Sequence, residues 1–245
     1  MYRLLIISLI FSLLTLNMSA QTADEIIDKV DKNMSAQNRV VESSMTIHGK
    51  RNSRTMTSIS HSVGDKQSFT EYLTPAREKG TKMLKLEDKL WIYSPSTDRT
   101  IQISGHMLRQ SVMGSDFSYE DMMEDRELTD IYDATMIGEE VIDSVNTYVL
   151  ELVAIVEDVS YHSRKMWIDK EHFVPLKEEL FAKSGKLLKR TTLTDIQQID
   201  GRWFPMKMVY KDMLKSGKGT EMRFNSIKFN QEIPEYIFTK AALKQ

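Results

Sequence analysis

The side chains that could do catalytic chemistry in this sequence do not fall into any catalytic pattern. The chain has 245 residues and no cysteine, which excludes thiolate nucleophiles and cysteine-ligated zinc sites. Its five histidines are scattered, and none forms the H-E-x-x-H pair of a helical zinc site. We therefore predict a protein without a metal site and without a cofactor.

Adjacent carboxylates are the remaining candidates for acid–base chemistry. Glu139 and Glu140 are neighbours, as are Glu178 and Glu179. Successive side chains of a strand point to opposite faces, so neither pair can converge on one bond. The sequence also lacks a G-x-S-x-G nucleophile elbow and a phosphate-binding glycine loop. These features predict that the protein is not an enzyme.

What the sequence offers instead is a methionine-rich stretch over residues 105–123. Its apolar side chains recur at roughly helical spacing, and Gly114 with Ser115 divides them into two short pieces. Methionine is unbranched and polarizable, so it repacks around apolar partners of variable shape, as acyl chains require. We expect a helical lid over an apolar ligand. The alternative is an ordinary core beneath a loop.

Two tryptophans complete the candidate ligand-binding set. Trp91 and Trp167 each lie in a predicted strand, where aromatic residues are ordinary core residues. Either can line a cavity, but a one-residue shift of register would turn it to the other face. The candidate ligand-binding residues are Trp91, Met107, Leu108, Val112, Met113, Phe117, Met122, Met123 and Trp167.

Two helix starts are marked by capping-box spacing. Residues 22–35 have apolar side chains along one face and predict an amphipathic helix. Thr22 can cap its start, with Glu25 three residues later. Ser118 and Asp121 repeat that spacing inside the methionine-rich stretch and predict a second helix start there.

The rest of the chain has the period of two that is typical of strands. Short connections, several of them rich in glycine, join neighbouring extended segments, and no βαβ rhythm is present. We predict about eleven antiparallel strands in one meander that the lid interrupts once. The extended segments are 41–48, 55–63, 68–73, 80–86, 90–93, 100–103, 133–137, 147–155, 160–168, 174–181, 187–196, 203–212 and 220–229.

A large, twisted antiparallel sheet must either close or be covered on its apolar face. The N-terminal helix and the lid are the only candidates for a cover. We therefore predict a mainly β (α+β) fold: a single large curved sheet that forms an incomplete barrel, with both helical segments across its concave apolar face. Such a lidded concavity is a natural site for an apolar ligand.

The first twenty residues predict export. A basic start precedes an apolar run over residues 4–16, which is too short for a comfortable membrane span and resembles a secretory signal peptide. We expect residues 1–20 to be removed and residues 21–245 to form one soluble domain. With 33 basic and 35 acidic residues in the chain, nothing indicates nucleic-acid binding.

Several stretches resemble a known family. Residues 90–95 with 98–99, and residues 113–121, are similar to outer-membrane lipoprotein-sorting proteins. The Gly-Ser-Asp-Phe-Ser-Tyr-Glu-Asp run within 113–121 is the most specific element. Residues 167–169, 173–177, 185–187 and 233–238 resemble the LolA/LolB type of periplasmic lipoprotein carrier. The resemblance covers nearly the whole mature chain. It implies an open half-barrel of about eleven strands with a helical lid and a cavity for acyl chains.

The expected function is therefore transport by burial, without a reaction. We predict a periplasmic, monomeric carrier that binds the acyl chains of lipoproteins or lipids and delivers them towards the outer membrane. Its partners would be an acylated cargo, an inner-membrane donor and an outer-membrane acceptor. The alternative is a non-catalytic sensor of the same fold that recognises a lipid, a peptide or a membrane transporter without shuttling it.

Overall fold

The fold is one antiparallel sheet of thirteen strands that does not close. A computed structural model describes residues 21–49 and 52–245, so the predicted signal peptide at 1–20 lies outside the described residues. The strands are β1 (Asn38–His48), β2 (Ser53–Val63), β3 (Gln67–Thr74), β4 (Lys82–Leu86), β5 (Lys89–Ser94), β6 (Arg99–Ile103), β7 (Tyr132–Ile142), β8 (Val145–Ala154), β9 (Ser163–Asp169), β10 (Pro175–Phe181), β11 (Leu187–Ile199), β12 (Arg202–Asp212) and β13 (Thr220–Phe229).

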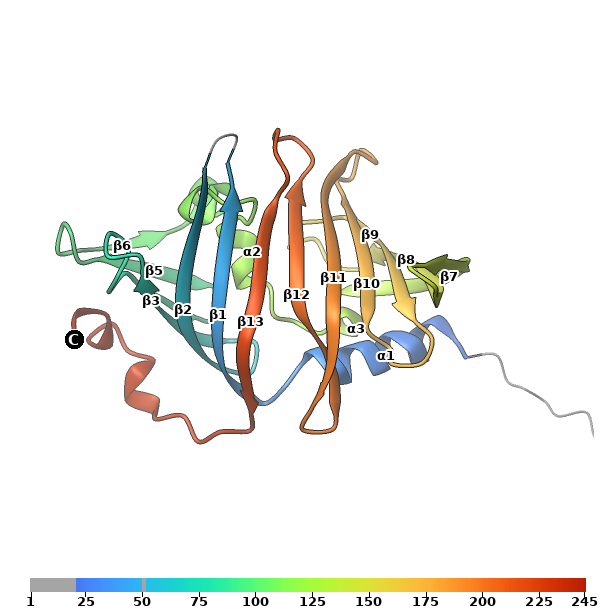
Figure 1. Cartoon of the computed structure of the whole chain (residues 1–245), viewed down its shortest axis with the longest axis horizontal. Helices are drawn as coiled ribbons and strands as arrows, with labels where there is room; N and C mark the ends of the chain where they lie inside the picture. Colours follow the sequence, from blue (N-terminus) through green and yellow to red (C-terminus); the bar gives the residue numbers. More distant parts are fainter. Residues whose placement is uncertain (1–20, 50–51) are drawn as a thin grey trace, which may run out of the picture.

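The order of the strands explains why an insert must cross the sheet. Strands β1 to β6 run outward to one edge, β7 to β13 run inward from the other, and β1 pairs with β13 in the middle (Figure 1). The chain must therefore travel from edge strand β6 to edge strand β7 after residue 103. We call the crossing segment, residues 104–131, the insert. It runs behind the sheet in Figure 1, on the same side as the N-terminal helix.

The predicted architecture is confirmed, with a difference in strand number. About eleven strands were expected and thirteen are present, because each extended segment named above forms a strand of its own. The short segments of β4, β5 and β6 each pair with a neighbour over five residue positions. They are therefore separate strands and not parts of a longer hairpin arm.

The N-terminal helix α1 spans Ala23–Met34 and has the predicted capping box. The Glu25 N–H donates to the Thr22 hydroxyl and the Thr22 N–H donates to the Glu25 carboxylate, each at 3.2 Å. Its apolar face packs on β7 and β12. The resulting cluster, which also includes buried residues of β8 and β9, covers one half of the concave face.

The insert has less regular helix than the sequence predicted. It contains η1 (Gly105–Arg109), η2 (Val112–Gly114), α2 (Tyr119–Met123) and α3 (Leu128–Ile131), of which η1 and η2 are 3₁₀ turns. Gly105, Met113 and Gly114 all have positive φ, which a continuous α-helix cannot contain. The predicted cap at Ser118 is confirmed, because the Ser118 N–H donates to the Asp121 carboxylate at 2.7 Å.

The outer face of the sheet carries the C-terminal tail. After β13 the chain forms η3 (Glu235–Ile237) and η4 (Ala242–Lys244). Phe238 and Leu243 of this tail pack on Phe69, Leu84 and Trp91. The two faces of the sheet are thus covered by different parts of the chain. No helix in residues 21–49 and 52–245 has the length and apolarity that a bilayer span requires.

Candidate functional site

A row of methionines crosses the middle of the concave face beneath the insert. Met45 on β1 pairs with Met56 on β2 and with Met222 on β13, and Met222 in turn pairs with Met208 on β12. Met45 and Met56 are buried, whereas Met208 and Met222 are half-buried. This methionine row gives the four central strands a continuous, deformable apolar surface.

The insert places its own apolar side chains on that surface. Met107, Leu108, Met113, Phe117 and Met123 pack into the same cluster as the methionine row. We call this cluster the insert–sheet interface. It brings together five of the nine residues predicted from the sequence. Val112 is fully buried and Met122 is half-buried, but neither belongs to the cluster.

The two predicted tryptophans lie elsewhere. Trp91 pairs with Leu84 across the sheet and packs under the C-terminal tail, on the outer face. Trp167 also points away from the helix-covered face, because its neighbours Met166 and Ile168 pack against α1. Its indole N–H donates to Glu140 at 2.7 Å, and the Lys177 ammonium lies 3.8 Å from its ring centroid. Neither tryptophan therefore faces the insert.

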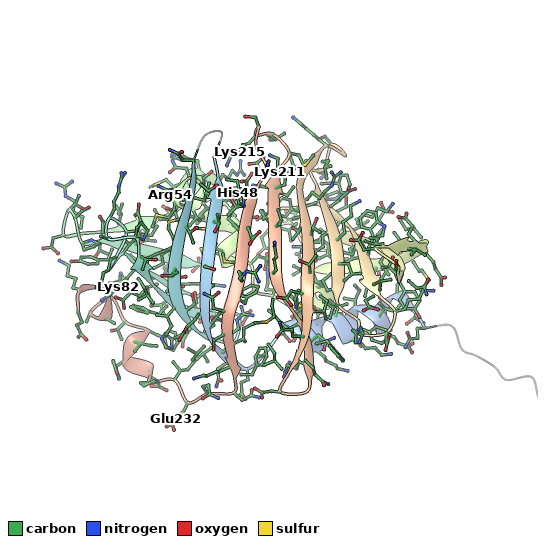
Figure 2. All side chains as sticks on the ribbon, viewed as in Figure 1. His48, Arg54, Lys82, Lys211, Lys215 and Glu232 are labelled. Atoms are coloured by element: carbon green, nitrogen blue, oxygen red, sulfur yellow. The ribbon has the colours of Figure 1, made fainter. Side chains whose placement is uncertain are left out.

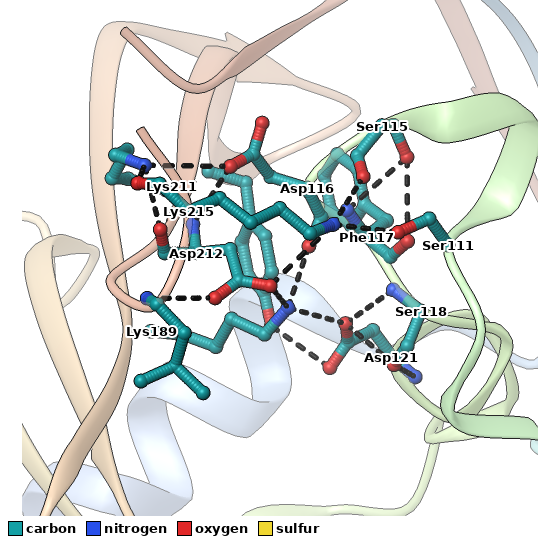
Figure 3. Close-up of polar contacts among 12 residues, drawn as sticks. Ser111, Ser115, Asp116, Phe117, Ser118, Asp121, Lys189, Lys211, Asp212 and Lys215 are labelled. Atoms are coloured by element: carbon teal, nitrogen blue, oxygen red, sulfur yellow. Dashed lines mark hydrogen bonds and ion pairs between the residues drawn. The ribbon is translucent and has the colours of Figure 1, made fainter. Parts of the chain in front are cut away.

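Buried polar groups fasten the insert to β11, β12 and β13 (Figure 3). The Asp116 carboxylate accepts the Asp212 N–H and the Thr220 hydroxyl, both at 2.9 Å. The Lys189 ammonium donates to the Asp116 carbonyl at 2.6 Å and to the Asp212 carboxylate at 3.2 Å. We call Asp116, Asp121, Lys189 and Asp212 the latch. All four side chains are at most 12% exposed, so their contacts are poorly screened by water.

Asp121 joins the latch to Tyr210 of β12 and to Tyr161, which lies just before β9. Its carboxylate accepts the Tyr210 hydroxyl at 2.9 Å and also the Tyr161 hydroxyl. Burial, followed by the Asp121 charge, raises the pKa of both phenols far above the ordinary value, so they remain hydrogen-bond donors. Phe117 stacks on the Tyr210 ring with centroids 4.3 Å apart. The motif at 114–121 therefore fixes the insert with the Asp116 and Asp121 carboxylates and places Phe117 against the sheet. We call Phe117 the aromatic plug.

A second ion-pair group holds the far end of the insert. Asp125 accepts the Lys85 ammonium at 3.0 Å and the Arg39 guanidinium at 2.8 Å. The Lys85 side chain is only 5% exposed. Asp31 of α1 then accepts the Leu128 and Thr129 N–H groups at 3.0 and 3.1 Å, which caps α3. The insert is thus fixed at both ends, to the sheet and to α1.

Partly satisfied polar groups lie on the concave face between the two apolar clusters. Glu178 pairs with Met166 and Thr191, and Thr191 pairs with Tyr210, so these residues form one cross-strand row. Arg164 lies diagonally beside them on β9. Arg164 Nε and Thr191 Oγ1 are buried without a hydrogen-bond partner among the described residues. Burial also raises the pKa of the Glu178 carboxyl, against the opposing effect of Arg164.

Side chains of the insert pack directly on the sheet beneath it. Two hollows on the described surface, with volumes of about 390 and 280 Å³, lie elsewhere. One is lined by Gln37, 63–67 and Glu87, the other by 139–141, Asn146, Thr147 and Lys170. The insert covers the apolar face by direct packing, since leaving that face in water would cost about 25 cal/mol for each Å² exposed. This arrangement is a closed one.

The latch predicts a specific pH dependence of stability. Burial alone would raise the pKa of Asp212, but the Leu214 N–H and the Lys189 and Lys215 ammonium groups hold it below the ordinary 3.8. A lowered carboxyl pKa contributes stability that is present above pH 3.8 and is lost as the pH falls further. Asp212→Asn is therefore expected to destabilise the protein most at neutral pH. Urea unfolding at several pH values should show the difference shrinking towards pH 3, and an undiminished difference there would contradict this account.

Known proteins share this fold. A protein-family profile described as "Uncharacterized protein" matches residues 64–245, which is most of the chain. The chain belongs to that family. No curated protein matches the chain.

Solved structures identify the fold as that of the LolA superfamily. A LolA superfamily protein from Nitrosomonas europaea is 28% identical with a TM-score of 0.75, over 91% of this chain and 100% of that one. A Vibrio parahaemolyticus domain described as an outer membrane lipoprotein-sorting protein is 24% identical with a TM-score of 0.79, over 91% and 98% of the two chains. A DUF1329 family protein from Desulfovibrio piger is 23% identical with a TM-score of 0.80, over 91% and 100%.

Sequence reasoning found the insert and missed its counterpart on the sheet. The methionine row comes from four strands that are far apart in the chain, so no local spacing reveals it. Lys189 was also missed, because a lone lysine in a strand has no local pattern that marks it as buried. The one available signal was the alternation of residues in β12, where Met206, Met208 and Tyr210 share a face.

Proposed function

We propose that this protein is a carrier that buries the acyl chains of lipoproteins or lipids beneath the insert. The observation that supports this proposal is the methionine row, a deformable apolar surface covered by a segment that forms no strand of the sheet. Each CH₂ group removed from water contributes about 0.8 kcal/mol, so a partly buried chain already binds usefully. The function would be transport by burial, and no step requires a chemical reaction.

The closed arrangement implies exchange of one apolar partner for another. Phe117 and the insert methionines cover the methionine row. Cargo would displace them, so the acyl chain must bind more strongly than the insert by enough to break the latch. The unpartnered Arg164 and Thr191 groups would then offer donors to a polar linkage of the cargo.

The cellular setting follows from the predicted signal peptide and from the fold. The carrier would work in the periplasm as a monomer after loss of residues 1–20. It would accept acylated cargo from an inner-membrane donor and release it to an outer-membrane acceptor. The cargo would leave when the acceptor offers a better apolar site than the carrier does.

A matched pair of variants tests whether acyl chains bind at the methionine row. Met208 faces the insert, while Val209 is the next residue of β12 and faces outward, and both are half-buried. A buried charge repels an acyl chain, so Met208→Glu is expected to abolish uptake of a fluorescent fatty acid, whereas Val209→Glu should retain it. Thermal unfolding of both variants shows whether a loss of uptake reflects lost binding or a destabilised fold.

Native mass spectrometry of the mature protein from its own periplasm would identify the natural cargo. A retained lipid or acylated peptide supports the proposal. A wild-type protein that arrives empty and takes up no lipid when offered it would overturn the proposal and favour a sensor. A protein that takes up lipid but never passes it to acceptor vesicles would also favour the sensor, because a carrier must release its cargo.

A further inference from the structure

Two hairpin turns lie at one rim of the sheet, and their exposed charges are basic. Strands β10 and β12 both end at this rim, where the turns that follow them lie side by side at the top of Figure 1. The β10–β11 turn contributes exposed Lys183 and Lys186, and the β12–β13 turn contributes exposed Lys215 and Lys218. Arg54 at the start of β2 lies at the same rim (Figure 2). We call this set the basic rim.

The β12–β13 turn also exposes two large apolar side chains among its lysines. Leu214 is 59% exposed and Met213 is 37% exposed. Single exposed apolar residues are ordinary, but here two of them occupy the tip of a turn that is flanked by basic residues. That combination suits the boundary between lipid headgroups and acyl chains, where the apolar tip enters and the ammonium groups meet phosphate.

The opposite rim carries exposed acidic residues. Asp65 in the β2–β3 turn, Asp200 in the β11–β12 turn and Glu232 after β13 are all exposed, and the exposed Lys66 of the first turn is paired with Glu87 at 3.7 Å. Glu232 lies at the lower rim of Figure 2, at the opposite end of the strands from Arg54 and Lys215. The two rims therefore differ in charge, although the formal net charge of the whole chain is only −2. An anionic surface would attract one rim and repel the other, which orients the molecule.

We infer that the basic rim, with Met213 and Leu214 at its tip, is a docking surface for an anionic lipid bilayer. The observations that carry this inference are the charge complementarity, the exposed apolar tip and the acidic opposite rim. Docking itself does not require the protein to be a carrier, and a protein that only senses membranes could use the same surface.

If the protein is the proposed carrier, docking at the basic rim would also loosen the insert. Lys215 donates to the Ser111 hydroxyl at 2.6 Å and to the Ser115 carbonyl at 2.9 Å, and Arg54 donates to the Met113 carbonyl. These rim cations therefore hold the insert closed. Headgroup phosphates would compete for the same donors, so a docked carrier would loosen its insert where cargo is exchanged.

Co-sedimentation of the mature protein with vesicles tests the docking surface. We expect binding to vesicles of equal parts phosphatidylglycerol and phosphatidylcholine, weakening with added salt, and little binding to phosphatidylcholine alone. Lys186→Gln with Lys218→Gln removes two cations that lie outside the latch and is expected to weaken binding about 30-fold. Leu214→Glu should weaken it by at least as much.

A control variant and an uptake assay make the result decisive. Tyr236 is 67% exposed on the C-terminal tail, so Tyr236→Glu introduces the same charge away from the basic rim and should leave binding unchanged. Uptake of a fluorescent fatty acid without vesicles should be normal in Leu214→Glu, which separates docking from the proposed carrier function. A wild type that ignores anionic vesicles overturns the inference. Equal binding by all variants, or binding to an acidic peptide in preference to vesicles, overturns it too.

Discussion

Asp116→Ala is expected to detach the insert and to lower the free energy of unfolding by about 3 kcal/mol, the scale seen when one partner of a buried polar pair is removed. The reason lies in what the carboxylate satisfies. It accepts the buried Asp212 N–H and the Thr220 hydroxyl, and Lys211 lies 3.7 Å away. Alanine would leave these donors buried without a partner, and relief would come from lifting the insert into water.

Hydrogen exchange and urea unfolding check this expectation together. The amides of Val112 and Tyr119, which donate to carbonyls within the insert, should exchange faster in the variant, while β11 and β12 amides should keep most of their protection. Asp130→Ala is the control, because Asp130 is an exposed carboxylate of α3 and its loss should change stability by less than about 0.5 kcal/mol. Stability lost evenly across the sheet would mean that Asp116 supports the whole fold and is no latch.

The sequence predicts those parts of this fold that depend on neighbouring residues. Both capping boxes are local patterns, and both are present at Thr22 and Ser118. The strand segments follow from alternation and turn residues in the same way. The insert follows from the break in that alternation at Gly105, although its positive φ values leave 3₁₀ turns where helix was expected.

What the sequence could not predict depends on register and long-range pairing. Whether Trp91 faces the insert or the C-terminal tail is decided by one residue of shift between β4 and β5, and the structure places it under the tail. Lys189 meets Asp116 across 73 positions of the chain. Such contacts arise only once β11 and the insert are brought together by the order of the strands.

The order of the strands also connects the fold to the proposed function. Because the first and last strands pair in the centre, the chain between β6 and β7 must cross a concave face that is already apolar. Under the proposed carrier function, this crossing segment leaves the apolar face while the sheet stays folded. The topology supplies the cover, and the latch together with the apolar insert–sheet interface sets how much free energy its detachment costs.

The aromatic plug offers a second large effect that is independent of the latch charges. Phe117 is 9% exposed and stacks on Tyr210 with an interplanar angle of 11°. Phe117→Ala removes this contact and is expected to destabilise the protein by about 3 kcal/mol through the space it leaves. That space adjoins the methionine row, so fluorescent fatty acid should enter faster than in the wild type. Phe117→Leu, which keeps most of the apolar volume, should lie between the two.

Phe69→Ala is the control that separates the loss of stability in Phe117→Ala from its effect on fatty-acid uptake. Phe69 is buried to a similar extent, at 8% exposure, but lies on the outer face beneath the C-terminal tail. Its loss should destabilise the protein comparably and leave the rate of fatty-acid uptake unchanged. If both alanine variants sped uptake equally, faster uptake would reflect general loosening of the fold. If only Phe117→Ala did so, the closed insert would be the barrier that cargo must displace, and the methionine row beneath it would be where the acyl chain binds.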